Sequence, residues 1–293
     1  MNRPLFIKRF SNILILVAVD GSKSSENALR QAIRFAKKED CTVTVVTVLP
    51  PYEGELDIAL ISNIRQSLRE PGERILKKAR AIAQEEGADV ETVLEEGKIH
   101  EAIIDIAREK DCDLIITGRR GLSGIERAFM GSVTARVIGY SPIDVLVMPG
   151  DSVLKWDNIL LAVDGSKYSD IAANKAISMA RMYGRELNIL SVVDVNEEFY
   201  AQAPDMVDEM VSKAREMVQD IEQTARLLSL QTSDFVREGE AHKRIIGMAN
   251  QVKADLICLG SHGRTGLRRL LMGSVAEKVI GHATCPVLVA KAY

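Results

Sequence analysis

The chain has 293 residues, of which 46% are hydrophobic, and its formal net charge is −3. This length suggests about two domains, and the small negative charge excludes the strongly positive surface that binds nucleic acid or anionic membranes. No window approaches ~20 consecutive apolar residues, so no segment is predicted to span a bilayer.

The first half of the chain alternates strand-like and helix-like segments. Continuous apolar runs predict buried strands, and apolar residues at helical spacing predict helices. In chain order we expect strand Ile13–Val19, helix Ser24–Lys38, strand Val43–Leu49, helix Pro71–Gln84, strand Val90–Leu94, helix Ile99–Arg108, strand Leu114–Thr117, helix Ser132–Gly139 and strand Val145–Met148. The same pattern recurs from Ile159 through Val289. Apolar strands separated by helices predict a doubly wound α/β fold with a parallel sheet buried on both faces.

Connections and chain ends are less regular. The segment Pro149–Lys155 is predicted to be the linker between the halves. The long connections Pro50–Glu70 and Asn196–Asp208 are expected to be mobile or partly helical. The apolar run that ends at Asp20 recurs at Ile159–Val163, which indicates a strand and not a signal peptide.

The four cysteines show neither paired spacing nor a CxxC motif. Cys112 and Cys258 lie beside or within apolar strands, where a small buried thiol is the expected role. This cysteine usage fits a reducing cytoplasm.

Two loops carry the same glycine spacing. The first reads GRRGLSGIERAFMGSV (Gly118–Val133) and the second GSHGRTGLRRLLMGSV (Gly260–Val275), 260 − 118 = 142 residues later. The segment AVDGSK of Ala18–Lys23 also recurs identically at Ala162–Lys167. The chain is therefore a duplication of a domain-sized unit. We predict a first domain at residues 1–149 and a second at 156–293.

In an open parallel sheet, ligands bind beyond the carboxyl ends of the strands. Asp20 ends the first strand and Gly118 follows the fourth, so the two face each other if these strands are neighbours. The same holds for Asp164 and Gly260 in the second half. An aspartate is suited to accept hydrogen bonds from ribose hydroxyls or to hold a magnesium ion.

The glycine loop favours an anion on this sheet edge. Gly118 and Gly121 are expected to adopt positive φ and to admit a phosphate where a Cβ would block it. Gly131 and Ser132 open a helix whose free N–H groups attract an anion, with Ser132 as an added donor or as the N-cap. Alone, either feature is most often a turn or a plain cap, but their joint recurrence at fixed spacing from an aspartate favours a phosphate site.

The pattern G-x2-G-x9-G-[ST], the strand-ending aspartate and the terminal Val-Leu-Val strand resemble the universal stress protein family in its tandem form, over about residues 11–149 and 156–293. The resemblance implies two tandem five-stranded parallel sheets of order 3-2-1-4-5, Rossmann-like and similar to the adenine nucleotide alpha-hydrolases. It also implies a site for ATP or AMP, with or without magnesium.

The resemblance assigns nucleotide-binding roles in both halves. The aspartates would serve the ribose or phosphate side, and Val48 and Val192, each 28 residues beyond its aspartate, would contact adenine through the backbone. The assigned residues of the first half are Ala18, Asp20, Val48, Gly118, Arg119, Gly121, Gly131, Ser132 and Val133. Those of the second half are Ala162, Asp164, Val192, Gly260, His262, Gly263, Gly273, Ser274 and Val275.

The two halves differ within this pattern. Arg119 and Arg120 replace the family-like Ser-His of the second loop, and they either strengthen phosphate binding or point to solvent. His262 is expected to contact phosphate, whereas His100 and His242 are expected at solvated helix ends. Ser141–Asp144 replaces the family-like Ala283–Pro286, which we expect to be neutral for binding.

The sequence contains no Ser-His-Asp signature, no HExxH motif and no metal-ligand cluster. We therefore predict no catalytic residues and favour a regulatory nucleotide-binding protein. One alternative is a slow ATPase, for which Asp20 and Asp164 are the evident general bases. The other alternative is a protein-interaction module indifferent to nucleotide.

The last strand of each half, Val145–Val147 and Val287–Val289, should lie at an edge of its sheet. Because exposed apolar edges are normally covered, we expect the two strands to pair antiparallel and to form an internal pseudo-dimer. The family resemblance further favours a homodimer of tandem chains, with protein partners beyond it unidentified.

Overall fold

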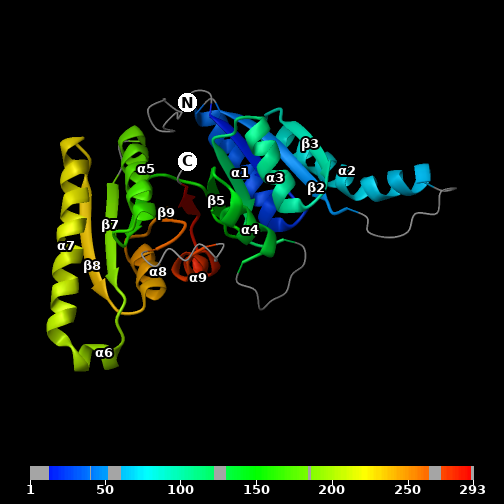
Figure 1. Ribbon diagram of the computed structural model, residues 1–293. Helices are drawn as coiled ribbons and strands as arrows, with labels where there is room; N and C mark the ends of the chain where they lie inside the picture. The colour runs from blue at the N-terminus through cyan, green and yellow to red at the C-terminus, as the bar shows by residue number, and fades with distance from the viewer. Residues whose placement is uncertain are drawn as a thin grey trace.

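The computed structural model describes residues 13–39, 41–51, 61–121, 130–183, 186–263 and 272–291. These residues form one sheet covered by helices on both faces, with the first half of the chain at the right of Figure 1 and the second half at the left. The strands of the first half are β1 (Leu14–Ala18), β2 (Thr42–Leu49), β3 (Glu91–Glu96), β4 (Leu114–Gly118) and β5 (Asp144–Met148). Those of the second half are β6 (Asn158–Val163), β7 (Glu186–Val193), β8 (Thr232–Glu238), β9 (Leu256–Gly260) and β10 (Val287–Ala290).

The ten strands follow the order β3-β2-β1-β4-β5-β10-β9-β6-β7-β8. Each half therefore has the order 3-2-1-4-5, as the family resemblance implies. All strand pairs within a half are parallel. The outermost strands, β3 and β8, are the least buried, and their exposed positions carry charged side chains such as Glu91 and Asp234. Charge on an outer strand discourages pairing with another chain.

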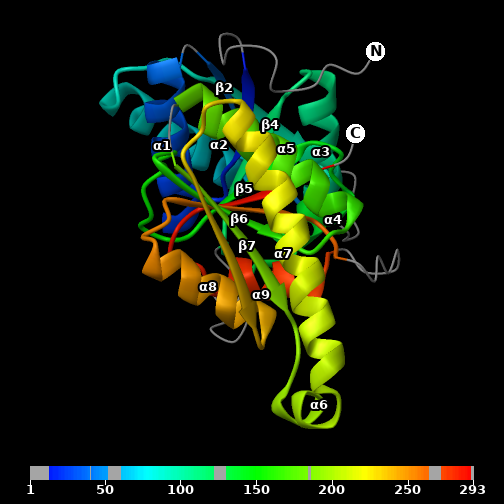
Figure 2. The same ribbon diagram turned by 90° about the vertical axis from the view of Figure 1, so that its left-hand side faces the viewer.

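The helices form two layers. They are α1 (Lys23–Glu39), α2 (Ile61–Glu85), α3 (Ile99–Glu109), α4 (Ser132–Tyr140), α5 (Lys167–Tyr183), α6 (Glu197–Gln202), α7 (Pro204–Leu227), α8 (Ala241–Gln251) and α9 (Ser274–His282). Helices α1, α2, α5 and α7 bury side chains in one core cluster, and α3, α4, α8 and α9 bury theirs in the other. Figure 2 shows the long α7 beside β7 and β8, with α6 at its lower end.

The two halves meet where β5 pairs antiparallel with β10. Leu146 lies opposite Leu288, flanked by the pairs Val147–Val287 and Val145–Val289. The valines enter one core cluster and the leucines the other, so both cores continue across the junction. The predicted internal pseudo-dimer is confirmed, and it takes the form of a single continuous sheet.

The linker between the halves lies along α1. Asn27 Nδ2 donates to Ser152 O at 2.8 Å, and Leu154 N donates to Gln31 Oε1 at 3.1 Å. Trp156 then packs between Phe35 and Tyr183, with ring centroids 5.3 and 6.0 Å apart. The linker is thus fixed to the first half and ends in an aromatic contact with both halves.

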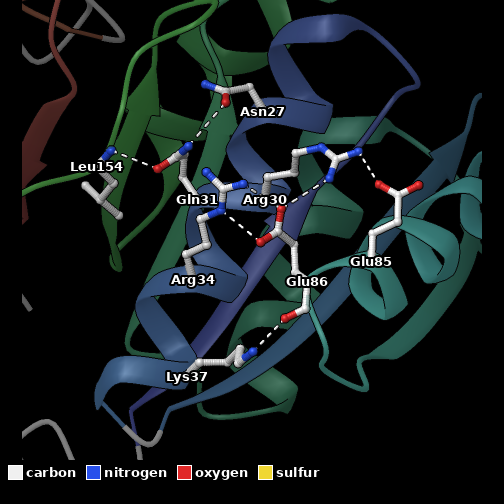
Figure 3. A network of polar contacts seen from close by, with 8 residues as sticks. All are labelled: Asn27, Arg30, Gln31, Arg34, Lys37, Glu85, Glu86 and Leu154. Atoms are coloured by element: carbon white, nitrogen blue, oxygen red, sulfur yellow. Dashed lines mark hydrogen bonds and ion pairs between the residues drawn. The ribbon is translucent and has the colours of Figure 1, made fainter.

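A charged network beside the linker fixes α1 to the end of α2, as Figure 3 shows. Arg30 contacts Glu85 and Glu86 at 2.6 and 3.2 Å, and Arg34 contacts Glu86 at 2.8 Å. The hydrogen bond from Arg34 contributes most to lowering the pKa of Glu86. The network orients α1, which also carries the linker contacts and begins just after Asp20.

Element bounds agree with the sequence analysis within a few residues, except in the long connections. Helix α2 begins at Ile61 and continues through Pro71, where the pattern predicted its start. The connection Asn196–Asp208 contains α6 and the start of α7. Two residues mark the starts of these helices. Asn196 is the N-cap of α6 and accepts from Phe199 N at 2.7 Å, and Pro204 occupies the first turn of α7. Residues 52–60 of the first connection lie outside the described residues.

The junction predicts the effect of proline there. We expect the double variant Leu146→Pro/Leu288→Pro to become sensitive to proteolysis within residues 149–155, because proline removes a ladder donor from two strands that have neighbours on both sides. The variant Leu146→Val/Leu288→Val, which keeps both donors, should resist like the parent chain. Limited proteolysis with mass mapping checks this, and parent-like resistance of the proline variant would show that the halves are held by other contacts.

Candidate functional site

The carboxyl ends of two neighbouring strands form the candidate site of each half. In the first half β1 pairs with β4, and Asp20 and Gly118 stand at their carboxyl ends. In the second half β6 pairs with β9 and brings Asp164 to the same relation with Gly260. Because β5 and β10 are antiparallel, the strands of the two halves run in opposite directions. The carboxyl ends of the two halves therefore point in opposite directions, and the two sites lie at opposite ends of the strands.

Asp20 has two distinct oxygen environments. Its Oδ1 accepts hydrogen bonds from Ser22 N at 3.0 Å and from Ser25 Oγ at 2.8 Å, which fixes the turn before α1. Its Oδ2 lies against the backbone of Gly121, where a Cβ would collide with it. One oxygen of the carboxylate thus has a structural role, and the other faces the glycine loop.

The second half repeats this arrangement. Asp164 Oδ1 accepts from Ser166 N at 3.0 Å, and a Cβ on Gly263 would lie 2.7 Å from Asp164 Oδ2. The predicted juxtaposition of aspartate and glycine loop is therefore present in both halves.

The glycines act differently from the prediction. Neither Gly118 nor Gly121 has positive φ; the left-handed residues are Gly21 (φ 82°) and Gly165 (φ 77°), directly after the two aspartates. A Cβ on Gly118 would lie 2.7 Å from Ser24 Oγ and 2.9 Å from Ser25 N. Gly118 is thus required by the close approach of α1 to β4. Gly260 has the same relation to Tyr168 at the start of α5.

A helix begins beside each aspartate. Gly131 is the N-cap of α4, and its N–H donates to Arg119 O at 2.9 Å; Gly273 and Ser261 make the same bond before α9. Neither cap residue makes a side-chain cap hydrogen bond. Ser132 is the first helical residue, so of its two expected roles that of N-cap is wrong. Its side chain is exposed, and Ser274 has the same position in α9. The unpaired N–H groups of a helix start favour an anion.

The apolar residues of the predicted sites lie on one face of the sheet. Ala18, Val48 and Val133 pack against the core cluster beneath α3 and α4. Their counterparts Ala162, Val192 and Val275 belong to the same cluster or pack against it beneath α8 and α9. Each set lies toward the carboxyl end of its strands or at the start of α4 or α9, as the sequence predicted.

Arg119 contacts the end of a helix in the other half, whereas phosphate binding or solvent exposure was expected. Its Nη1 donates to Ala283 O at 2.7 Å and to Ile280 O at 3.4 Å, the last carbonyls of α9. A cation at a helix C-terminus is stabilised by the exposed carbonyls and by the helix dipole. Arg119 therefore connects the first loop with the second half of the chain, whereas the adjacent Arg120 is exposed.

The second site contains an aromatic pair. The rings of His262 and Tyr168 lie 5.1 Å apart, and His262 Nδ1 lies 3.1 Å from Ser261 Oγ. Lys167 Nζ lies 5.0 Å from the centroid of the Tyr168 ring. Tyr168 is not among the predicted site residues. Its signal was the replacement of Ser24, the equivalent residue of the first half, by an aromatic side chain.

The histidines at the helix starts are mostly buried, whereas solvated helix ends were expected. The side chains of His100 and His242 are each only 12% exposed. His100 packs on Tyr140, with centroids 5.5 Å apart, and His242 on His282, with centroids 6.0 Å apart. Desolvation is the largest cause that lowers the pKa of His242. Both residues pack between neighbouring helices on the same face of the sheet.

The cysteines are free thiols, and Cys112 and Cys258 are buried as predicted. Burial raises the pKa of Cys112 to about 11 and that of Cys258 to about 12. A thiol with such a pKa is rarely the reactive thiolate near neutral pH. Among the described residues, no group of three or more histidine, cysteine or acidic side chains is placed to hold a metal ion. No helix in the described ranges has the length and apolarity to cross a bilayer.

Comparisons with known proteins agree with this geometry. The sequence model of the universal stress protein family matches residues 14–149 and 155–291. A universal stress protein of Mycolicibacterium smegmatis is 28% identical over 94% of this chain and 96% of its own length. One from Methanocaldococcus jannaschii is 33% identical over 52% of this chain and 91% of its own length. The crystal structure of a universal stress protein from Archaeoglobus fulgidus has the same fold, with a TM-score of 0.73, 22% identity and 98% coverage of both chains.

The close approach at Gly118 predicts a stability effect. We expect Gly118→Ala to lower the free energy of unfolding by about 1–3 kcal/mol, because the new methyl group must displace the backbone of α1. Gly150→Ala is the matched control, since a Cβ there meets no atom within 4 Å. Urea unfolding of both variants checks this, and equal stability would contradict the packing role of Gly118.

Proposed function

The chain belongs to the universal stress protein family, and on that premise we propose that each half binds an adenine nucleotide, ATP or AMP. The protein would act through the bound nucleotide as a regulator. We assign the two sites to the domains of residues 1–149 and 156–293, and we place the protein in the cytoplasm as a homodimer of tandem chains.

The observation that carries the proposal is the repeated pairing of a carboxylate with a helix start. In each half an aspartate Oδ2 faces the glycine-loop backbone, and a helix without a side-chain cap begins beside it. The carboxylate is suited to accept from ribose hydroxyls, and the helix start is suited to phosphate. We assign the backbone contact to adenine to Val48 and Val192, which lie near the ends of β2 and β7.

A regulatory role is favoured over hydrolysis by the state of the candidate bases. Asp20 Oδ1 already accepts two hydrogen bonds that fix the turn before α1, and Asp164 Oδ1 accepts one. A general base has to reach the attacking water, and these bonds hold one oxygen of each carboxylate in the turn before its helix. The direct experiment is to identify any co-purified nucleotide by mass spectrometry and to follow ADP release with time. ADP release that continues over repeated turnovers would favour the slow-ATPase alternative, and no bound nucleotide would favour the interaction module.

The proposal of one site in each half predicts the binding stoichiometry. Isothermal titration calorimetry with ATP or AMP should give two sites per chain. Gly121→Val and Gly263→Val should each remove one, because a branched side chain would occupy the space between loop and aspartate. Gly150→Val, far from contacts, should retain both. A single site in the parent chain would contradict the two-site proposal.

The divided role of Asp20 predicts that two substitutions differ. Asp20→Asn keeps an oxygen for Ser22 N and Ser25 Oγ but places an amide at Oδ2. It should retain thermal stability and weaken nucleotide binding at the first site by about 1.5–3 kcal/mol, the loss of a charge-assisted hydrogen bond. Asp20→Ala should lose both stability and affinity.

Asp164→Asn should have the corresponding effect on the second site. Calorimetry and thermal unfolding on the same preparations distinguish the two roles. Full affinity in Asp20→Asn would contradict the binding role of this residue and leave it a structural role.

A further inference from the structure

The strands that join the two halves have the same apolar sequence. Both β5 and β10 contain Val-Leu-Val, and the three central pairs of the junction join these residues. An antiparallel pair of two such strands is nearly two-fold symmetric. The apolar contacts would therefore be the same if β5 paired with β5 of a second chain, or β10 with a second β10. They do not determine which partner β5 accepts.

A buried ion pair at this junction breaks the symmetry. Lys175 Nζ, from α5 of the second half, hydrogen-bonds both carboxylate oxygens of Asp144, the first residue of β5. Lys291 N, directly after β10, donates to Asp144 Oδ1 at 2.8 Å. Asp144 is 1% exposed, Lys175 6% and Lys291 5%. Burial raises the pKa of Asp144, and the charge of Lys175 opposes this shift.

Neither partner of this pair is repeated at the equivalent position in the other half. The equivalent of Asp144 is Pro286 (144 + 142), and the equivalent of Lys175 is Gln31 (175 − 144). Gln31 is buried and directs its Oε1 to the linker, where it accepts from Leu154 N. The anion belongs to the first half and its cation to the second. The pair therefore forms only when β5 meets β10.

Pairing between identical strands would deprive each of these charges of its partner. With two copies of β5 in the same register, Asp144 of each chain would face Gln31 of the other, a buried carboxylate without a cation. With two copies of β10, Lys175 would face Pro286. A buried charge that loses its partner is strongly destabilising, whereas a pair replaced by two neutral groups is often tolerated.

We propose that the Asp144–Lys175 pair selects the partner of the β5 edge, so that β5 accepts β10 and rejects β5 of a second chain. The surface that β5 accepts consists of strand β10 and of Lys175 on the neighbouring helix α5. This selection concerns assembly and is independent of nucleotide binding. It resembles the use of a polar group to fix register and partner in other buried interfaces.

Residue 146 provides a direct reporter of the partner. In the native junction Leu146 lies opposite Leu288, but in a β5–β5 pair it would lie opposite Leu146 of the second chain. Directly opposed cross-strand residues approach closely enough for a disulfide. Leu146→Cys chains would be refolded from denaturant at increasing concentration, oxidised, and separated on a non-reducing gel. The parent chain with its native cysteines gives the background of linked dimer.

The test compares Leu146→Cys alone with Leu146→Cys in Asp144→Asn/Lys175→Gln. The double neutral background presents β5 with the same Asn–Gln contact from either partner and removes both charges of the pair, and circular dichroism establishes whether it folds. We expect background dimer for Leu146→Cys alone and a severalfold, concentration-dependent increase in the neutral background. Val147→Ala, which weakens the junction but keeps the ion pair, should stay at background with the reporter.

Either of two results would overturn the proposal. One is abundant linked dimer for Leu146→Cys with the ion pair intact. The other is background dimer in the neutral variant, with native circular dichroism confirming that it folds. If the neutral variant fails to fold, Asp144→Asn/Lys175→Met replaces it, since it also removes both charges and keeps an apolar side chain in the place of the lysine stem. An unchanged dimer fraction in that variant would also count against selection.

Discussion

The antiparallel contact between β5 and β10 is the constraint on which the arrangement of the molecule depends. Each half ends in a short apolar strand, and such a strand exposes unpaired backbone groups unless another strand covers it. Pairing these strands merges two five-stranded sheets, continues both cores across the junction and leaves the charged β3 and β8 as outer edges. It also reverses the strand direction between the halves. The two candidate sites, each at the carboxyl ends of its own strands, therefore lie on opposite sides of the sheet along the strand direction.

Within each half, the site is determined by how closely a helix approaches a strand. Gly118 allows α1 to begin against the end of β4, and the left-handed Gly21 turns the chain between Asp20 and that helix. The turn holds one oxygen of Asp20, so the other is directed at the glycine loop. The structural role of this aspartate therefore does not exclude the proposed binding role. The same residue closes the turn with Oδ1 and presents Oδ2 to the site.

The sequence predicted most of the fold, because continuous apolar strands, helical periodicity and the internal repeat are strong, local signals. It also predicted that Asp20 faces the glycine loop, since the two follow neighbouring strands. It did not predict what depends on contacts between distant segments. Arg119 reaches the end of α9 in the other half, and Gly118 is required by the backbone of α1. Neither contact leaves a pattern near its own residue. The start of α2 was missed because a proline normally marks the first turn, and Pro71 lies inside the helix.

The two halves share the aspartate, the glycine loop and the helix start of each site but carry different charged residues at the junction, and the geometry explains why. A symmetric dimer interface must be complementary to itself, so every contact occurs twice. Here the interface is formed once, between β5 of the first half and β10 of the second. Each side can therefore carry residues that are complementary to the other side and not to itself. Asp144–Lys175 and Arg119–Ala283 are contacts of this kind, each formed between one half and the other. Each site, by contrast, is assembled within its own half from an aspartate, a glycine loop and a helix start. Two sites therefore require the same residues twice, whereas a single junction needs only one matched set.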